Sequence, residues 1–334
     1  MVVGYRNNEK KVFIFDAYFQ RMKPLFLFVF FVAIFLSCKK DKTKQHSNPP
    51  NGEDTGTLKD YNKDIIIANW NIEWFGDGAM FKGNLTDQEN NAGKILKYLN
   101  ADLYGLCEIV DTARFGRMIR TSLGDEFRYH ISYYTSGSQK LAYVYNRNIF
   151  RKVSVRPYMG VSSQAFYNFG TRYPYLLTAE LAVNGTKKTM SVVLIHAKAN
   201  ADIDSYNRRF SGSKELKDSL DKDFTGKNFL LLGDFNDNFD KSITMGKPSP
   251  YQNFLVDFSR YHAITQPLNV AGNQSTLGYA NSVIDQQIIS SSMTKWYKSN
   301  SSKIRTDVSN AVSNYTTGNT SDHYPITSVF HFSP

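Results

Sequence analysis

Short apolar runs that end at a polar residue recur along this chain. The clearest run, Phe229–Leu232, stops at Gly233 and is followed at once by Asp234 and Asn236. A continuous apolar run of this length predicts a strand covered on both faces, and the loop after such a strand is where α/β proteins place reactive groups. Asp234 and Asn236 lie two positions apart, so in extended backbone they face the same side. The alternative interpretation is an ordinary polar turn, since Gly, Asp and Asn all favour turns.

From residue 64 onward, runs typical of strands alternate with runs typical of helices. Helices are expected over residues 86–99, 112–123 and 204–222, the first with Thr86 as its N-cap and Glu89 at the capping-box spacing. Strands are expected over residues 65–68, 102–108, 127–134, 140–145, 175–183, 188–195, 229–232, 283–289 and 324–332, with a hairpin turn at Asn184-Gly185. No internal linker or close repeat interrupts the pattern, so one domain is predicted over residues 64–334.

Polar or ionisable side chains stand at six of these strand ends. They are Asn71, Glu108, His196, Asp234 with Asn236, Asp285, and Asp322 with His323. If the strands converge, these groups form an oxygen-rich cluster with two imidazoles at one edge of a sheet pair. Carboxylate and amide oxygens suit a hard cation such as Mg²⁺, with Mn²⁺ or Ca²⁺ as alternatives. The chain has only two cysteines and six histidines, which argues against structural zinc.

In this order, the strand-end residues resemble the motifs of the endonuclease/exonuclease/phosphatase superfamily. Its members include pancreatic-type deoxyribonucleases, abasic-site endonucleases, inositol-polyphosphate phosphatases and bacterial sphingomyelinases. The matching segments are Asn71 with Glu73, Glu108, Gly233–Asn236, Ile284-Asp285 and Ser321–Pro325. The resemblance covers nearly the whole domain, and it implies an α/β fold: a four-layer α/β sandwich of two packed mixed β-sheets flanked by helices, as in deoxyribonuclease I.

The resemblance also implies a set of metal ligands. Asn71 and Glu108 would sit at the metal, and Asp322 would reach it. Glu73 occupies a position where some members have a second metal-associated carboxylate. One departure is Cys107, which stands where the family usually has Gln before the metal-binding Glu.

For the chemistry, the resemblance implies that Asp234 and Asn236 hold the scissile phosphate and the attacking or departing oxygen. His323, polarised by Asp285, would act on the water. His near neutral pH is well suited to such proton transfer.

His196 falls where deoxyribonucleases and sphingomyelinases carry a catalytic His. Gln139 falls where deoxyribonucleases pair that His with a Glu, which leaves the role of His196 open, because Gln cannot stabilise an imidazolium by charge. Arg172, in Thr171-Arg172-Tyr173-Pro174, resembles an Arg-x-Pro segment whose Arg contacts phosphate.

The N-terminal part has the pattern of an export segment. Met22-Lys23-Pro24 precedes an apolar stretch over residues 25–36, too short to span a membrane, and Cys38 follows directly after Ser37. This resembles the lipobox of bacterial lipoproteins, which predicts a signal over residues 1–38, a lipid on Cys38 and a flexible tether over residues 39–63. Met22 is an alternative start, and a plain cleaved signal or short membrane anchor is the alternative interpretation.

The charge is uneven: of the net +10, residues 1–63 hold 11 Lys/Arg against 6 Asp/Glu, leaving 29 against 24 for the domain. A mildly basic domain is compatible with a polyanionic substrate.

From the motifs, the export segment and this charge, we predict a metal-dependent phosphodiesterase, a nuclease for DNA or RNA. It would act outside the cytoplasm as a monomer, anchored to a bacterial membrane. The alternatives are a sphingomyelinase-like or inositol-phosphate enzyme, for which Phe166–Phe169 is the nearest docking run, and a non-catalytic binding protein. Candidate nucleic-acid contacts are Trp70, Trp74, Arg172, Lys198, Arg208 and Arg209. The alternative interpretation for several of them is a core residue or a solvated helix face.

Overall fold

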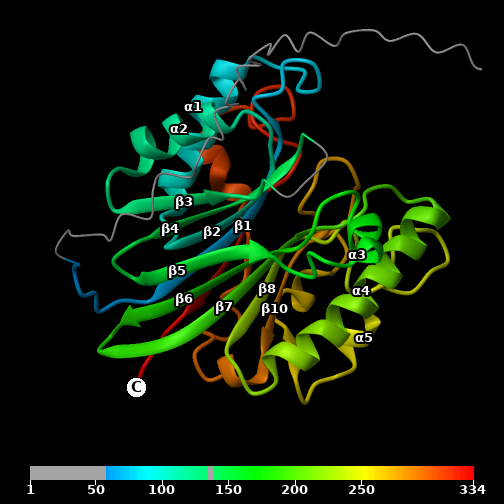
Figure 1. The fold of residues 1–334 in the computed structure, drawn as a ribbon. Helices are drawn as coiled ribbons and strands as arrows, with labels where there is room; N and C mark the ends of the chain where they lie inside the picture. Colours follow the sequence, from blue (N-terminus) through cyan, green and yellow to red (C-terminus); the bar gives the residue numbers. More distant parts are fainter. Residues whose placement is uncertain (1–57, 134–137) are drawn as a thin grey trace, which may run out of the picture. The chain divides into compact units, whose positions relative to one another are not determined.

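Two six-stranded mixed sheets pack face to face in the computed structural model, which describes residues 58–133 and 138–334 (Figure 1). The first sheet contains, in spatial order, β11 (Lys303–Ile304), β12 (Ile326–Phe330), β1 (Ile65–Phe75), β2 (Leu103–Ile109), β4 (Lys140–Asn146) and β3 (Phe127–Ile131). The second contains β5 (Phe150–Pro157), β6 (Tyr175–Val183), β7 (Thr186–His196), β8 (Phe229–Asp234), β10 (Asp285–Ser290) and β9 (Tyr261–Ala263).

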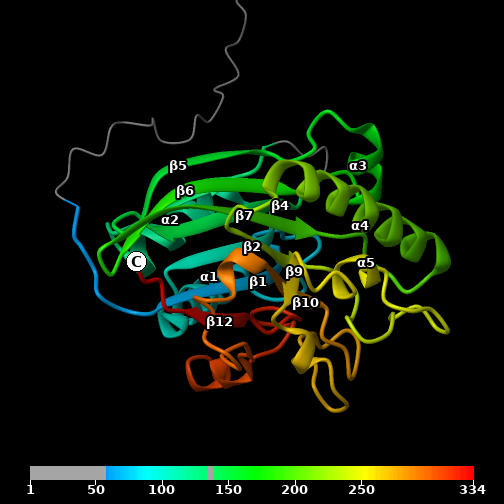
Figure 2. The ribbon, with the colours of Figure 1, turned by 90° about the horizontal axis from the view of Figure 1, so that it is seen from below.

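Helices cover the outer face of each sheet. The first sheet carries α1 (Leu85–Leu99) and α2 (Thr112–Leu123), and the second carries α3 (Ser163–Asn168), α4 (Ile203–Phe224) and α5 (Gln252–Leu255), as Figures 1 and 2 show from two directions. The predicted four-layer sandwich is therefore confirmed.

The strand β8 shows why this architecture needs a continuous apolar run. Leu230 and Leu232 pack into the core between the sheets, whereas Phe229 and Leu231 pack into the core beneath the helices. The sheets approach so closely that a Cβ on Gly105 of β2 would lie 2.3 Å from Leu232 Cδ1. Both faces of β8 are thus buried, as the sequence predicted.

Strand pairing brings distant segments to one edge of the molecule. In the second sheet, His196 is in register with Asp234, and Asp234 is in register with Asp285. In the first sheet, β1 runs parallel to β2, and Asn71 pairs with Cys107, the neighbour of Glu108. The predicted convergence of strand ends is therefore a consequence of these registers.

Several local features differ from the expectations. The N-cap of α1 is Asn84, not Thr86: the Asn84 side chain accepts from the backbone N–H groups of Thr86 and Asp87. The turn at Asn184-Gly185 is confirmed, since both residues have positive φ, 53° and 70°. The strands β5, β9 and β11 and the short helices α3 and α5 were not predicted.

The export segment, Met22, Cys38 and residues 39–57 of the tether lie outside the described residues. Residues 58–63 contact the domain: Tyr61 Oη donates to Glu126 Oε2 (2.8 Å), and Lys63 Nζ donates to Asp102 Oδ1 (2.9 Å). Within the described ranges, no helix is both long and apolar enough to cross a membrane.

Candidate active site

A bulge at the end of β1 positions the first motif. The register between β1 and β2 shifts between Asn71 and Phe75, and Glu73 and Trp74 have positive φ, 37° and 47°. Gln88 of α1 is fully buried beneath this bulge, and its Nε2 donates to the carbonyl oxygen of Glu73 (2.7 Å). β-Bulges next to active sites commonly change the direction of side chains. This bulge interrupts the regular alternation of side chains along β1 at Glu73.

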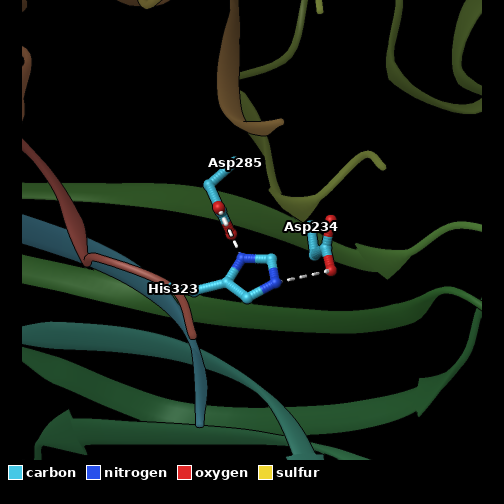
Figure 3. Close-up of side chains that lie close together, drawn as sticks. All are labelled: Asp234, Asp285 and His323. Atoms are coloured by element: carbon cyan, nitrogen blue, oxygen red, sulfur yellow. Dashed lines mark hydrogen bonds and ion pairs between the residues drawn. The ribbon is translucent and has the colours of Figure 1, made fainter. Parts of the chain in front are cut away.

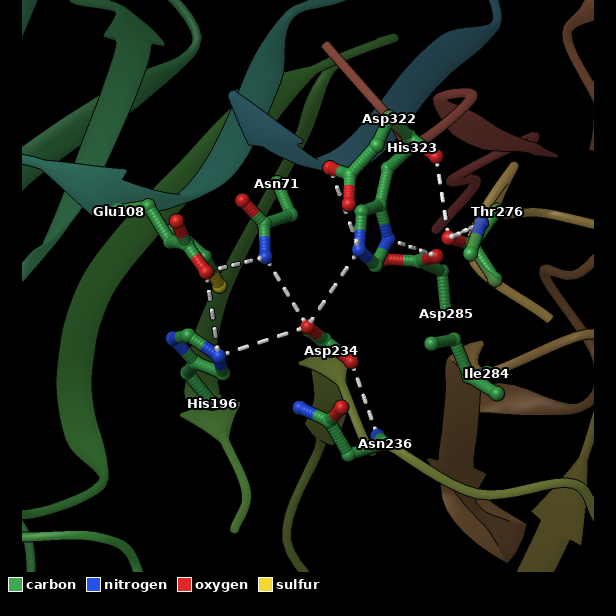
Figure 4. Close-up of polar contacts among 12 residues, drawn as sticks. Asn71, Glu108, His196, Asp234, Asn236, Thr276, Ile284, Asp285, Asp322 and His323 are labelled. Carbon is green, nitrogen blue, oxygen red and sulfur yellow. Dashed lines mark hydrogen bonds and ion pairs between the residues drawn. The ribbon is translucent and has the colours of Figure 1, made fainter. Parts of the chain in front are cut away.

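Asn71 connects carboxylates that come from the two sheets. Its Nδ2 donates to Glu108 Oε1 and to Asp234 Oδ2, each at 3.0 Å (Figure 4). Its Oδ1 accepts from the backbone N–H of Glu73 (3.0 Å), and Glu108 Oε2 accepts from that of Trp74 (2.8 Å). The amide of Asn71 thus fixes the distance between the two carboxylates.

His323 is held by a buried carboxylate. Its Nδ1 lies 2.8 Å from Asp285 Oδ2, an oxygen that also accepts from Ser275 Oγ (2.8 Å) (Figure 3). The carboxylate requires the proton on Nδ1, so Nε2 faces Asp322 Oδ1 at 3.7 Å and Asp234 Oδ2 at 4.0 Å. Burial alone would lower the pKa of His323, but the carboxylates of Asp285, Asp322 and Asp234 raise it well above its usual value.

His196 has the opposite electrostatic environment. It is buried, and its Nε2 lies 3.5 Å from Asp234 Oδ2 and 3.6 Å from Glu108 Oε1. Burial, and then the positive charges of Arg172 and His323, lower the pKa of His196 well below its usual value. The two imidazoles therefore flank Asp234 in different protonation states, His196 neutral and His323 favoured as the cation.

Gln139, which the resemblance placed where deoxyribonucleases pair this His with a Glu, does not contact the His196 side chain. Its Oε1 accepts from Arg172 Nη1 (2.9 Å). Arg172 also donates from Nε to the carbonyl oxygen of His196 (3.1 Å), and His196 Nδ1 is buried without a hydrogen-bond partner. Arg172 thus holds the end of β7, and its own contact with phosphate stays a prediction.

Asp234 is the centre of the cluster. Its Oδ2 faces Asn71, His196 and His323, and its Oδ1 accepts from the backbone N–H of Asn236 (2.9 Å) (Figure 4). Burial, opposed by His323 and reinforced by Asp285, raises the pKa of Asp234 to about 7. Asn236 has a positive φ of 51°, and its Nδ2 donates to the carbonyl oxygen of Ala197 (3.2 Å).

The carboxylates of Glu108 and Asp322 lie close enough to Glu73 to act on it electrostatically, and all three side chains offer oxygen ligands. Burial, followed by the negative charges of Asp322 and Glu108, raises the pKa of Glu73 to about 7, although a hydrogen bond from Thr317 opposes this. Glu73 Oε2 is buried without a hydrogen-bond partner. A cation would satisfy this oxygen and relieve the repulsion, and oxygen ligands are those that Mg²⁺ prefers.

A second group, Asp234, Asp285 and His323, has possible ligand atoms within 4.8 Å of one another. Its chemistry suits proton transfer better than metal binding, because Asp285 Oδ2 is already occupied by His323 Nδ1 and by Ser275. The neighbouring carboxylates of Glu73, Glu108 and Asp322 are those that the resemblance implies at a metal, and this assignment stays a prediction.

Two of the proposed nucleic-acid contacts are wrong. Trp70 is buried, and its Nε1 donates to the carbonyl oxygen of His323 (2.8 Å). Arg209 forms a fully buried ion pair with Asp237, Nε to Oδ2 at 2.9 Å. Both side chains hold the loops that carry site residues, so neither can contact a substrate.

Sequence reasoning missed Gln88 and Ser275. Gln88 supports the bulge that carries Glu73, and Ser275 shares an oxygen of Asp285 with His323. Their only signal in the sequence is polarity within otherwise ordinary helix and loop segments. Long-range contacts, which a local pattern does not encode, give them their roles.

Neither protein-family models nor curated proteins match the sequence. Solved structures do match. An endonuclease/exonuclease/phosphatase from Bacteroides vulgatus has a TM-score of 0.57 at 14% identity, over 81% of this chain and 100% of the other. D. rerio TDP2 complexed with a single-strand DNA product has 0.56 at 12%, over 81% and 100%. The 3′ phosphatase NExo from Neisseria, bound to a product DNA hairpin, has 0.56 at 15%, over 80% and 100%. With its two packed sheets and flanking helices, the chain has the deoxyribonuclease I-like fold of the endonuclease/exonuclease/phosphatase superfamily.

Proposed function

We propose that this chain is a metal-dependent phosphodiesterase, and that its substrate is a nucleic acid. One observation carries the proposal: Asp285 and His323 form a buried pair whose free imidazole nitrogen faces Asp234, next to a group of three carboxylates. Phosphodiester hydrolysis needs proton transfer and charge neutralisation at one place, and this arrangement supplies groups for both.

Glu73, Glu108 and Asp322 would hold the cation, with Asn71 beside them. A bound Mg²⁺ would neutralise charge on the phosphoryl oxygens. Mn²⁺ and Ca²⁺ are the alternatives, because they also take oxygen ligands.

Side chains of the protein would transfer the proton and position the phosphate. His323 would exchange a proton with the attacking water through Nε2, while Asp285 keeps the ring in one tautomer and orientation. Asp234 and Asn236 would position the phosphate and the oxygen that attacks or departs. His196, neutral and buried, would donate a hydrogen bond from Nε2 to a phosphoryl oxygen.

The choice of nucleic acid is supported by two structural neighbours that contain DNA products. The lipid alternative needs an exposed apolar docking run. In the run Phe166–Phe169, Phe169 is buried and Phe166 is half-buried against Tyr173, so Tyr167 is the one exposed aromatic ring of the run.

A substrate panel tests the proposal. Supercoiled plasmid, structured RNA, sphingomyelin and inositol phosphates are each incubated with the full chain and Mg²⁺, with EDTA and a His323→Ala variant as controls. We expect plasmid or RNA cleavage that requires both the metal and His323. Hydrolysis of a lipid or inositol phosphate while nucleic acids stay intact would contradict the proposed substrate. No hydrolysis of any of the four substrates would contradict the proposal that the chain is a phosphodiesterase.

We also propose that the protein is exported and lipid-anchored through Cys38 on a bacterial membrane, as a monomer. The support is the apolar stretch of residues 25–36 directly before Ser37-Cys38. Metabolic labelling with a radioactive fatty acid tests this. The full chain should be labelled in bacteria and a Cys38→Ser variant should not, and equal labelling of both would contradict the anchor.

A further inference from the structure

Three cationic side chains lie near one another beside His196, at the end of β7. Arg172 donates to the carbonyl oxygen of His196, and Lys198 follows two residues later. A Cβ on Gly170 would lie 3.3 Å from Arg172 Nη2 and 3.9 Å from Lys198 Cδ, so both side chains pass over this glycine. Arg208 approaches from α4, a helix that lies next to α3 (Figure 1).

Arg208 also fixes an aromatic ring at this place. Its guanidinium carbon lies 4.1 Å from the centroid of the Tyr167 ring, and its Nε donates to the carbonyl oxygen of Tyr167 (3.1 Å). The Tyr167 side chain is nevertheless 49% exposed. The ring is thus held in place by the arginine and still offers surface to a ligand. We call Arg172, Lys198, Arg208 and Tyr167 the cationic patch.

Nearby carboxylates act on two of the cations of this patch: Glu108 and Asp234 on Arg172, and Asp202 on Lys198. Partial burial and the cations of Arg208 and Arg172 lower the pKa of Lys198, and Asp202 opposes this. The Asp202 carboxylate is itself engaged at the start of α4, where it accepts from the N–H and the hydroxyl of Ser205 at 2.9 and 2.8 Å. Cations held close together favour an anionic partner with several charges.

We propose that the cationic patch binds the single-stranded nucleic acid next to the cleaved phosphate, with the phosphate backbone over Lys198 and Arg208 and an unpaired base stacked on Tyr167. Basic residues along a backbone combined with an aromatic platform are how proteins bind single strands without sequence preference. A paired base cannot stack on a side chain without leaving its duplex. The inference rests on the proposed function and narrows it to single-stranded or frayed substrates.

Binding without cleavage tests the patch. The full chain is titrated in EDTA against short fluorescein-labelled single-stranded DNA, single-stranded RNA and blunt duplex DNA, and fluorescence anisotropy gives Kd. For Tyr167→Ala we expect Kd for the single strands to rise about 5- to 100-fold, and Tyr167→Trp should retain affinity. For Arg208→Ala, the slope of log affinity against log salt should fall by about 0.7.

Arg120→Ala is the matched control. Arg120 is an exposed arginine on α2, over the other sheet, and its Nη1 contacts the hydroxyl of Tyr129 (3.4 Å). This variant removes the same charge and should bind as the wild type does. Weaker binding of DNA alone, or of RNA alone, in the patch variants would identify which nucleic acid the patch selects.

Wild-type affinity in Tyr167→Ala and Arg208→Ala, an equal loss in Arg120→Ala, or tighter binding of duplex than of single strands would overturn the inference. Hydrolysis of bis(4-nitrophenyl) phosphate by the wild type with Mg²⁺ distinguishes a failure of the patch assignment from a failure of the proposed function. If this diester is hydrolysed while the patch variants bind normally, only the patch assignment fails. If no phosphodiester is hydrolysed, the proposed function fails.

Discussion

Nδ1 of His323 lies 2.8 Å from Oδ2 of Asp285, although the two residues are 38 positions apart in the chain. Asp285 is fully buried, and the pair lies against Asp234 (Figure 3). A buried carboxylate behind an imidazole fixes its tautomer and favours its charged form. This relationship is the basis of the first prediction.

Asp285→Asn should keep the fold and lose most of the activity. The amide is similar in size, but it removes the charge that orients and stabilises the imidazolium of His323. We expect kcat for phosphodiester hydrolysis to fall by about 10²–10⁴. Asp218→Asn, which changes an exposed aspartate on α4 outside the cluster, is the control, and steady-state rates check the comparison. Equal activity of both variants would show that the pair does not take part.

Gly233→Ala should destabilise the protein. Gly233 has a φ of 133°, and a Cβ there would lie 2.1 Å from the carbonyl oxygen of Ile195 in the neighbouring strand. Backbone strain and overlap together should lower the free energy of unfolding by roughly 2–5 kcal/mol. Gly226 also has a positive φ, 71°, with nothing within 4 Å of its Cβ position, so Gly226→Ala should cost only about 1 kcal/mol. Urea unfolding measures both, and similar losses would contradict the overlap.

Arg209→Ala should be strongly destabilising, and Arg208→Ala should not. Arg209 and Asp237 form an ion pair in which both side chains are fully buried, so removing the arginine leaves an unpaired buried carboxylate. Breaking such a pair costs about 3–5 kcal/mol. Arg208 is half-buried, and the contacts given above for its guanidinium are with Tyr167, so its loss should cost roughly 1 kcal/mol. The two adjacent positions provide their own control in a urea titration. A loss under about 1 kcal/mol at Arg209 would contradict the structural role.

The stability of the protein should depend on pH through Asp257. Burial would raise its pKa, but hydrogen bonds from Lys217 and Arg260, at 2.9 and 2.6 Å, lower it below the usual 3.8. Because the folded-state pKa is the lower one, this contribution is fully present above the unfolded-state pKa and is lost as pH falls through the folded-state value. The difference in unfolding free energy between wild type and Asp257→Asn should be largest above pH of about 5 and shrink below 3.8. A difference that grows on acidification would contradict this sign.

Much of the site could be predicted because it lies at strand ends. The register that aligns His196, Asp234 and Asp285 follows from three neighbouring strands, each with a readable apolar run. A local pattern can therefore place these groups at one edge without any knowledge of the loops.

The errors have physical reasons. Asn84 and Thr86 are both good N-caps, and which of them caps α1 depends on backbone geometry that a pattern of residue types does not fix. Arg209 has the sequence appearance of a solvated helix residue, but its partner Asp237 comes from a different segment. Gln139 falls where the resemblance places the partner of the first His, but its Oε1 accepts a hydrogen bond from Arg172 Nη1.

The missed strand β5 is an edge strand. In Phe150–Pro157, buried or half-buried residues alternate with exposed ones, and the run contains arginine, lysine and serine. Charged edge strands resist association with other chains, but they lack the apolar run by which the central strands were recognised. Edge position, like long-range pairing, is a property of the whole fold.

The rate of bis(4-nitrophenyl) phosphate hydrolysis as a function of Mg²⁺ concentration decides whether the reaction depends on a metal at this cluster. The wild type should be inactive in EDTA, and its rate should saturate with Mg²⁺. Glu108→Gln should need at least about tenfold more Mg²⁺, since it loses a charged ligand. Asp285→Asn should saturate at the same Mg²⁺ concentration with a much lower maximal rate. Hydrolysis that persists in EDTA, or that both variants carry out at the wild-type rate and Mg²⁺ dependence, would contradict a metal-dependent reaction at this cluster.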